Sequence, residues 1–351
     1  MVILCSVINI QSTRNSGSKP LETIYQVSNL KMHYPIERGF AKKVVGYIRA
    51  VNGITFNVYQ RETLGLVGES GCGKSTTANC LIRLFKPSSG SILYNNKDGQ
   101  QVDLARLSDH ELRFYRKEAQ MIFQDPYSSL NPRMTIHEVV GEPLLVNHIA
   151  KGGEITDRVG AILKRVGLRS EYMKRYPHAF SGGQRQRVAI ARALIIEPRV
   201  VICDEPVSSL DVSVQAQIIE LLKDLQTEFG NTYLFISHDL SVVRYISDRI
   251  IVMYLGQIVE MCDSDELFNN PLHPYTRALI DAVPDVDPKK KTVVPIMGEP
   301  GDPSKVYTGC SFYSRCKHAT DLCAAQPPLL VDFPSNGKEH FVSCHHAQNW
   351  R

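Results

Sequence analysis

The residues with the clearest chemical meaning lie between Gly68 and Ser75, in the run GESGCGKS. An apolar stretch (64–67) precedes this GxxxxGK[ST] pattern, and an amphipathic stretch follows it. Glycines here let the backbone curl so that its N–H groups form an anion-binding nest at the start of a helix. The pattern predicts a nucleotide site in which Lys74 reaches the β- and γ-phosphates, Ser75 ligates Mg²⁺ and Thr76 donates to a phosphate oxygen. The other residues expected to contact the nucleotide are Gly68, Ser70, Gly71, Cys72 and Gly73.

A pair of acids, Asp204 and Glu205, follows the apolar run 200–203. Four consecutive apolar residues predict a strand buried on both faces, as in a parallel sheet. Because open α/β sheets bind ligands at the carboxyl ends of their strands, we expect both acids beside the phosphate loop. Asp204 would then hold Mg²⁺, and Glu205 would orient or deprotonate the attacking water. Acids at strand ends are often merely solvated, so the pair gains its meaning from the upstream loop.

A third motif lies between these two, in the run FSGGQRQRVAIARAL (180–194). Ser181 can cap a helix whose apolar residues recur at helical spacing. Gly182 and Gly183 would leave the N–H groups at that helix end accessible, which predicts a second anion site. A plain helix cap is the alternative.

Composition limits the kind of protein that carries these motifs. The 351 residues are 43% hydrophobic and 22% charged, and their formal net charge of +4 is too small to indicate nucleic-acid binding. No apolar run reaches the roughly 18 residues that a membrane helix needs. The apolar start lacks the basic leader and cleavage site of a signal peptide, so we expect residues 1–20 to form a flexible tail. Cysteines scattered singly through the first 262 residues fit reduced thiols in a cytoplasm.

Taken in order, the loop, the SGGQ run, the acid pair and a later single histidine resemble the ATP-binding-cassette ATPases. The resemblance implies an α/β P-loop fold with a RecA-like core, an antiparallel β subdomain and a helical subdomain that carries the SGGQ signature. It also implies that the signature of one subunit, Ser181 to Gln184, closes over ATP held by the phosphate loop of another.

Three further residues match this family by position. Gln124 in MIFQDP matches the residue that contacts the metal and the attacking water, and Asp211 in SSLD matches the residue that crosses the dimer. His238 in YLFISHD matches the histidine that contacts the γ-phosphate. Together with Glu205, His238 implies a site that hydrolyses ATP as well as binding it.

The aromatic residue that stacks on adenine is expected to be Tyr34, which follows the first short strand where the family places it. The segment from Pro35 to Tyr47 is longer than in minimal cassettes, so Phe40 and Tyr47 compete for this role. Core packing is the alternative for all three.

Four longer stretches narrow the resemblance to the dipeptide/oligopeptide importer ATPases, and within them to the F-type subunit: FQDPYSSLNPRMT (123–135), RYPHAFSGGQRQR (175–187), CDEPVSSLDVSVQAQI (203–218) and NPLHPYTRAL (270–279). This implies a peripheral ATPase on the cytoplasmic face of the membrane that energises peptide import. The implied partners are two permease subunits, a second homologous ATPase and an extracytoplasmic peptide-binding protein. Two alternatives stay open: import of nickel or another small solute, and a regulatory subunit that binds nucleotide and iron–sulfur but hydrolyses little.

Four cysteines gather near the end of the chain: Cys310, Cys316, Cys323 and Cys344. Their spacing lacks the C-x2-4-C knuckle typical of structural zinc, whereas iron–sulfur spacings vary more; zinc and unligated thiols are the alternatives. The importer resemblance implies a [4Fe–4S] site on these four residues. His345 and His346 flank Cys344 and are alternative ligands, although exposed tail histidines are the default interpretation. Because the segment is proline-rich and short of apolar residues, we expect the metal to stabilise it; a redox or iron-sensing role is the alternative.

The expected organisation is a tail (1–20), a nucleotide-binding domain (21–265) with its helical subdomain near 125–185, and a cysteine-bearing extension (266–351).

Overall fold

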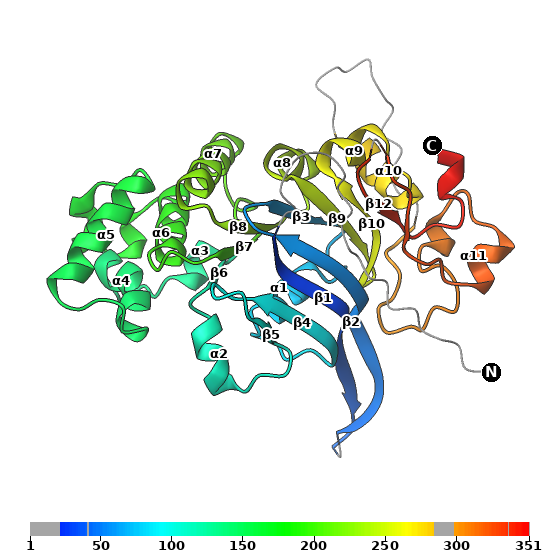
Figure 1. Cartoon of the computed structure of the whole chain (residues 1–351), viewed down its shortest axis with the longest axis horizontal. Helices are drawn as coiled ribbons and strands as arrows, with labels where there is room; N and C mark the ends of the chain where they lie inside the picture. The colour runs from blue at the N-terminus through cyan, green and yellow to red at the C-terminus, as the bar shows by residue number, and fades with distance from the viewer. Residues whose placement is uncertain (1–21, 41, 284–297, 336, 351) are drawn as a thin grey trace.

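The computed structural model describes residues 22–40, 42–283, 298–335 and 337–350, which form two β-sheets with helices around them (Figure 1). The tail expected over residues 1–20 lies outside the described residues. The strands are β1 Thr23–Arg38, β2 Lys43–Tyr59, β3 Thr63–Val67, β4 Ser89–Asn95, β5 Gln101–Asp103, β6 Ala119–Ile122, β7 Val200–Asp204, β8 Thr232–Ile236, β9 Arg249–Tyr254, β10 Gln257–Asp263, β11 Val331–Asp332 and β12 His340–Val342.

The larger sheet runs in the order β11-β12-β10-β9-β3-β8-β7-β6, and its centre is parallel. Every residue of β3, β7 and β8 is buried. Successive side chains of a strand point to opposite faces. Leu64 and Leu66 accordingly pack into one core cluster and Val67 into another. A sheet covered on both faces is what continuous apolar strands require, and it brings the carboxyl ends of β3, β7 and β8 to one edge.

The smaller sheet, in the order β2-β1-β4-β5, is antiparallel and shares a core cluster with one face of the larger sheet. Its long β1–β2 hairpin extends beyond the rest of the sheet (Figure 1). Phe40, in the turn of this hairpin, is fully exposed.

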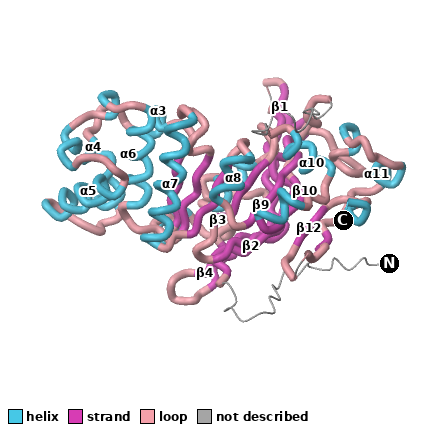
Figure 2. The backbone as a smooth tube through the Cα atoms, turned by 90° about the horizontal axis from the view of Figure 1, so that it is seen from above, coloured by secondary structure: helices cyan, strands magenta, loops and turns pink. Residues whose placement is uncertain are grey.

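Helices cover the other face and build a lobe at one end of the molecule, where α4, α5 and α6 pack together (Figure 2). None of the helices within the described ranges is long and apolar enough to cross a membrane. The α-helices are α1 Lys74–Leu81, α2 Asp109–Tyr115, α3 Pro126–Ser129, α4 Ile136–Val146, α5 Gly153–Arg165, α6 Gly182–Leu194, α7 Val212–Phe229, α8 Leu240–Ile246, α9 Ser264–Asn269, α10 Pro274–Asp281 and α11 Asp321–Ala325. Short 3-10 turns are η1 Ser170–Lys174, η2 Pro177–Ala179, η3 Tyr313–Arg315 and η4 Ala347–Trp350.

The C-terminal residues continue the larger sheet, because β12 pairs antiparallel with β10. Glu260 of β10 is one of the paired residues, opposite Val342, and its side chain is fully buried. One of its carboxylate oxygens accepts the Leu272 N–H at 2.6 Å and lies 2.8 Å from Nε2 of His340, and the other accepts the His273 N–H at 3.1 Å. A single carboxylate therefore joins β10, β12 and the segment that leads into α10.

Glu260→Gln tests this junction. The amide keeps one acceptor oxygen but turns the other into an NH₂ group, so at least one buried donor loses its partner. We expect the free energy of unfolding to fall by about 2 kcal/mol in urea denaturation.

The matched control is Lys338→Met, which removes the exposed ion pair of Lys338 with Asp263 (2.8 Å) in the same region. Exposed pairs contribute little, so this variant should stay within about 0.5 kcal/mol of wild type. Equal losses for the two variants would contradict the special role of Glu260.

Candidate active site

The phosphate loop connects β3 to α1, and its path requires glycine at two places. Gly68 and Gly73 have φ angles of 148° and 106°. A Cβ atom on Gly68 would lie 2.2 Å from the carbonyl oxygen of Met253, and one on Gly73 would lie 2.1 Å from that of Ala50. Backbone packs against backbone at both points, so no side chain could make room.

Lys74, the first residue of α1, folds back over this loop. Its ammonium group donates to the carbonyl oxygens of Gly68 at 2.8 Å and Glu69 at 3.0 Å. The Cys72 side chain is buried beneath the loop, and burial raises the pKa of its thiol. Lys74 therefore sets a positive charge at the loop, as a phosphate site needs.

The first acid of the predicted pair meets the loop directly. Asp204 ends β7, and its carboxylate accepts a hydrogen bond from the Ser75 hydroxyl at 2.9 Å. Burial raises the pKa of Asp204; the Ser75 bond opposes this shift and the neighbouring Glu205 charge adds to it. Two hard oxygen donors side by side at a phosphate loop fit Mg²⁺, which prefers carboxylate and hydroxyl oxygens.

The second acid is held between two elements. Glu205 has a φ of 48°, and its N–H donates to the carbonyl oxygen of Ile236 at 3.0 Å, across the end of β8. Its carboxylate accepts from the Gln124 side-chain amide at 2.9 Å and lies 3.2 Å from Nδ1 of His238. Gln124 follows β6 and His238 follows β8, so three neighbouring strands of the sheet deliver this cluster.

One pocket of about 440 Å³ joins the loop to this cluster. Its lining residues are Ala50, Ser70, Gly71, Gly73, Lys74, Ser75, Thr76, Gln124, Glu205 and His238. Most of the predicted loop residues and the predicted hydrolytic residues Gln124, Glu205 and His238 are thus brought to one cavity. Gly68, Cys72 and Asp204 are not among its lining residues. Ala50, in the middle of β2, was not predicted, because an alanine in a strand carries no chemical signal.

The signature residues lie elsewhere. Ser181 caps α6, where its hydroxyl accepts the Gln184 N–H at 3.4 Å and the Gln184 side chain accepts the Ser181 N–H at 3.1 Å. Gly183 lies so close to α7 that a Cβ atom would meet Val214 at 2.5 Å. Asp211 begins α7. In the described part of the chain, Ser181, Gly182, Gly183, Gln184 and Asp211 are not among the residues that line the phosphate-loop pocket.

The expected adenine-stacking residue lies near the loop but outside the pocket lining. The ring of Tyr34, on β1, packs edge-on against Phe85 with centroids 6.2 Å apart. Burial raises the pKa of its hydroxyl. Phe40 and Tyr47 lie in the exposed part of the β1–β2 hairpin.

The four C-terminal cysteines line one small cavity together with His345 and His346. Burial raises the pKa of the Cys310 and Cys344 thiols to about 11, and the neighbouring sulfur atoms of the group add to both shifts. Nε2 of His346 lies 3.6 Å from Sγ of Cys323. Within the described ranges, no three His, Cys, Asp or Glu side chains stand where they could hold a single metal ion.

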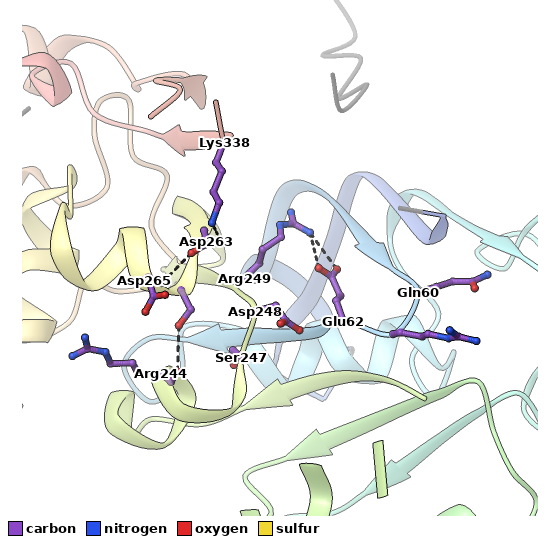
Figure 3. A pocket seen from close by; sticks show the side chains of 11 residues that line it. Gln60, Glu62, Arg244, Ser247, Asp248, Arg249, Asp263, Asp265 and Lys338 are labelled. Carbon is purple, nitrogen blue, oxygen red and sulfur yellow. Dashed lines mark hydrogen bonds and ion pairs between the residues drawn. The ribbon is translucent and has the colours of Figure 1, made fainter. Parts of the chain in front are cut away.

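A second pocket, at the opposite end of β3, is larger but lacks a phosphate-binding backbone (Figure 3). Four of its charged side chains form pairs: Arg249 lies 3.2 Å from both carboxylate oxygens of Glu62, and Lys338 binds Asp263. The other charged lining residues are two arginines and two aspartates, Arg61, Arg244, Asp248 and Asp265. Positive and negative charges in the lining therefore balance, which leaves little net attraction for an anion, so we assign the nucleotide to the phosphate-loop pocket.

Two protein families match the chain, "ABC transporter" over residues 51–208 and "Oligopeptide/dipeptide transporter, C-terminal region" over residues 259–323. The first match contains the phosphate loop, the signature and the acid pair. The second contains three of the four clustered cysteines.

The curated relatives are similar over nearly their whole length. Oligopeptide transport ATP-binding protein AppF of Bacillus subtilis (strain 168) is 48% identical, covering 92% of this chain and 97% of that protein. Oligopeptide transport ATP-binding protein OppF of Escherichia coli (strain K12) is 46% identical, covering 94% and 98%. Among solved structures, a dimeric post-hydrolysis state of the ATP-binding cassette MJ0796 bound to ADP and Pi is 30% identical with a TM-score of 0.60, covering 69% of this chain and 99% of that one.

The raised pKa of Asp204 makes a prediction about stability. The Asp204 carboxyl keeps its proton to a higher pH in the folded protein than in the unfolded chain. Its ionised form therefore destabilises the fold once the pH exceeds the pKa that Asp204 has in the unfolded chain. The full cost applies above the folded pKa. Asp204→Asn carries no charge, so in urea denaturation it should be more stable than wild type at pH 7, and the difference should shrink as the pH falls towards 4.

Asp125→Asn is the control, because removal of this charge is expected to change stability in the opposite direction. Asp125 caps α3, and hydrogen bonds from the Tyr127 and Ser128 N–H groups lower the pKa of its carboxyl. Removing that charge should reduce stability at pH 7. A loss of stability in Asp204→Asn as well would refute the proposed cost of the buried charge.

Proposed function

The chain belongs to the family of oligopeptide and dipeptide transport ATP-binding proteins, which are ABC-type ATPases, and we propose that its ATP hydrolysis drives import of dipeptides or oligopeptides across the cytoplasmic membrane. The observation that carries the proposal is the placement of Glu205 between Gln124 and His238 in the pocket of the phosphate loop. A site for nucleotide binding alone would not need a carboxylate aimed into the phosphate pocket. The peptide substrate is inferred from the relatives, which are oligopeptide transport ATP-binding proteins.

We assign the roles of the site residues from this geometry. The backbone of the loop and Lys74 neutralise the phosphate charge. Ser75 and Asp204 would hold Mg²⁺, which would supply positive charge to the phosphate oxygens when bound. Glu205 accepts the proton of a water whose oxygen forms a bond to the γ-phosphorus, while the bond from that phosphorus to ADP breaks. Gln124 and His238 fix the direction of the Glu205 carboxylate.

A second ATPase subunit completes the site in this proposal. Ser181 to Gln184 lie outside the phosphate-loop pocket of their own chain, and the similar cassette structure described above is a dimer. A helix N-terminus that faces outward is a good partner for the phosphates of a nucleotide held by another subunit. Asp211, which begins the next helix, would lie at the same interface.

The helical lobe is the proposed contact with the permease subunits. Large apolar side chains are exposed on it, notably Tyr127 at 64%, Leu145 at 58% and Val146 at 63%. Such side chains are typical of a surface that another protein covers. We therefore place the chain at the cytoplasmic face of the membrane, with residues 21–265 as the nucleotide-binding domain, the lobe near 125–185 at the permease, and residues 266–351 as an extension. An extracytoplasmic peptide-binding protein would deliver the substrate.

The variant Glu205→Gln tests the hydrolytic role. The amide cannot take a proton from water, so turnover should fall by at least about 100-fold while ATP binding persists. ATPase rate and nucleotide affinity would be measured on the same preparation. Unchanged turnover would refute a role for Glu205 in hydrolysis and favour the regulatory alternative, and Glu220→Gln, on an exposed face of α7, is the control expected to retain full activity.

We further propose that Cys310, Cys316, Cys323 and Cys344 hold a [4Fe–4S] cluster. All four line one cavity, which is the observation that supports this proposal. The cluster would stabilise a segment that has few apolar residues of its own.

Metal analysis of protein purified without oxygen tests this proposal. We expect about four irons and matching sulfide per chain, with a broad visible absorption band, and loss of the band in Cys316→Ser. One zinc per chain without colour, or no metal at all, would refute the cluster and leave the ATPase assignment intact.

A further inference from the structure

Arg315, which lies between two of the clustered cysteines, reaches the phosphate loop. Its guanidinium group donates two hydrogen bonds to the carboxylate of Glu69, at 2.7 and 2.9 Å. Glu69 is the second residue of the loop motif. The pair is bidentate and the Arg315 side chain is only 4% exposed, which is the geometry in which an Arg–Glu contact is strong and specific.

Glu69 is fixed at three points by other residues. Its side chain is held by Arg315, and its N–H donates to the Tyr275 hydroxyl at 2.9 Å. Its carbonyl oxygen accepts the ammonium of Lys74 at 3.0 Å. The position of the Glu69 peptide therefore depends on Arg315 and Tyr275, and the position of the Lys74 ammonium depends in turn on that peptide.

The position of Arg315 is itself set by the cysteine-bearing turn. The Tyr313 N–H donates to the carbonyl oxygen of Cys310 at 3.0 Å, and the Cys316 N–H donates to that of Tyr313 at 3.2 Å. The Cys310 N–H donates to the carbonyl oxygen of Cys323 at 2.7 Å. Phe312, at the start of this turn, packs against Tyr254 and Tyr275 with ring centroids 5.3 and 5.4 Å away. These contacts pack the turn against Tyr254 and Tyr275, and Tyr275 in turn contacts the phosphate loop through Glu69.

We propose that Arg315 is a positioning residue for nucleotide binding: it holds Glu69, and through Glu69 the phosphate loop and Lys74, so that the structure of the cysteine cluster sets the affinity for ATP. The inference rests on the proposed nucleotide site, and it adds a coupling between that site and the C-terminal cysteines. Because linkage is reciprocal, ATP binding in turn stabilises the turn that carries Cys310 and Cys316.

The first test is Arg315→Lys, which keeps the charge but loses the bidentate geometry. We expect the Kd for ATP to rise roughly tenfold, as measured with Glu205→Gln in the background so that no nucleotide is consumed. Glu69→Gln, which removes the charge from the other side of the pair, should have the same effect. The Kd of the double variant Arg315→Lys/Glu69→Gln should be no higher than that of either single variant, because each of these variants loses the same Arg315–Glu69 interaction.

Arg249→Lys is the matched control, since Arg249 forms another buried pair with a glutamate, Glu62, at the opposite end of β3 (Figure 3). It should lower stability in the same way but leave the Kd for ATP within about twofold of wild type. Equal affinity in Arg315→Lys, Glu69→Gln and Arg249→Lys would overturn the inference.

Hydrogen exchange on the protein without nucleotide separates this inference from the proposed function. Arg315→Lys should speed exchange of the amides of residues 68–74, and Arg249→Lys should not. This readout needs no ATP, so it separates two outcomes. Failure of the wild-type protein to bind ATP would count against the proposed function. Unchanged exchange of residues 68–74 in Arg315→Lys would count against the coupling alone. Cys316→Ser should speed exchange at the same amides and add nothing in the Arg315→Lys background; independent, additive effects would refute the link between the cysteines and the loop.

Discussion

A phosphate-binding loop works through backbone N–H groups that face its ligand, so other parts of the protein must fix its shape. In this chain the loop is pressed against backbone on two sides: Gly68 meets the carbonyl of Met253 and Gly73 meets that of Ala50. The Gly256 N–H donates to the carbonyl oxygen of Cys72 at 2.9 Å. The loop therefore depends at once on β2, on β9 and on the turn from β9 to β10. A motif that is continuous in sequence owes its geometry to segments that lie far from it along the chain.

The same edge of the sheet concentrates charge, which explains the arrangement of its polar groups. Asp204 and Glu205 are adjacent carboxylates, and the charge of Glu205 raises the cost of ionising Asp204. Ser75 donates to one of them, and Gln124 donates to the other. The Ser75 bond lowers the pKa of Asp204 but does not cancel the effects of burial and of the Glu205 charge, and a bound cation would lower it further. Such a site gives up some stability for the sake of function.

The chemical core of the site could be predicted from sequence because each of its motifs is local. The loop pattern fixes its own helix start, and the run before Asp204 predicts a buried strand from four residues. The capping of α6 by Ser181 was likewise predictable, since a cap involves residues only three positions apart. The family membership follows from the order of these motifs, and the comparisons confirm it.

What could not be predicted depends on contacts between distant residues. Nothing in the spacing of the cysteines indicates that Arg315 reaches Glu69, because the two are 246 positions apart. The pairing of β12 with β10 was also invisible, since a three-residue strand carries no periodic signal. The burial of Glu260 between a histidine and two backbone N–H groups has the same origin: a lone glutamate in a strand gives no sign of its partners.

These distant contacts change how the C-terminal residues should be understood. A module joined only by a linker moves independently of its neighbour and shares little buried surface with it. Here β12 is a strand of the same sheet that contains β3. Glu260 of β10 bonds to His340 of β12, and Arg315 pairs with Glu69 of the phosphate loop. Packed interiors transmit displacement because they contain little free volume. A change in the shape of the cysteine-bearing turn must therefore move either residues within the turn or the phosphate loop next to it. Because Arg315 is buried and makes two hydrogen bonds to Glu69, the turn cannot move far without moving the loop.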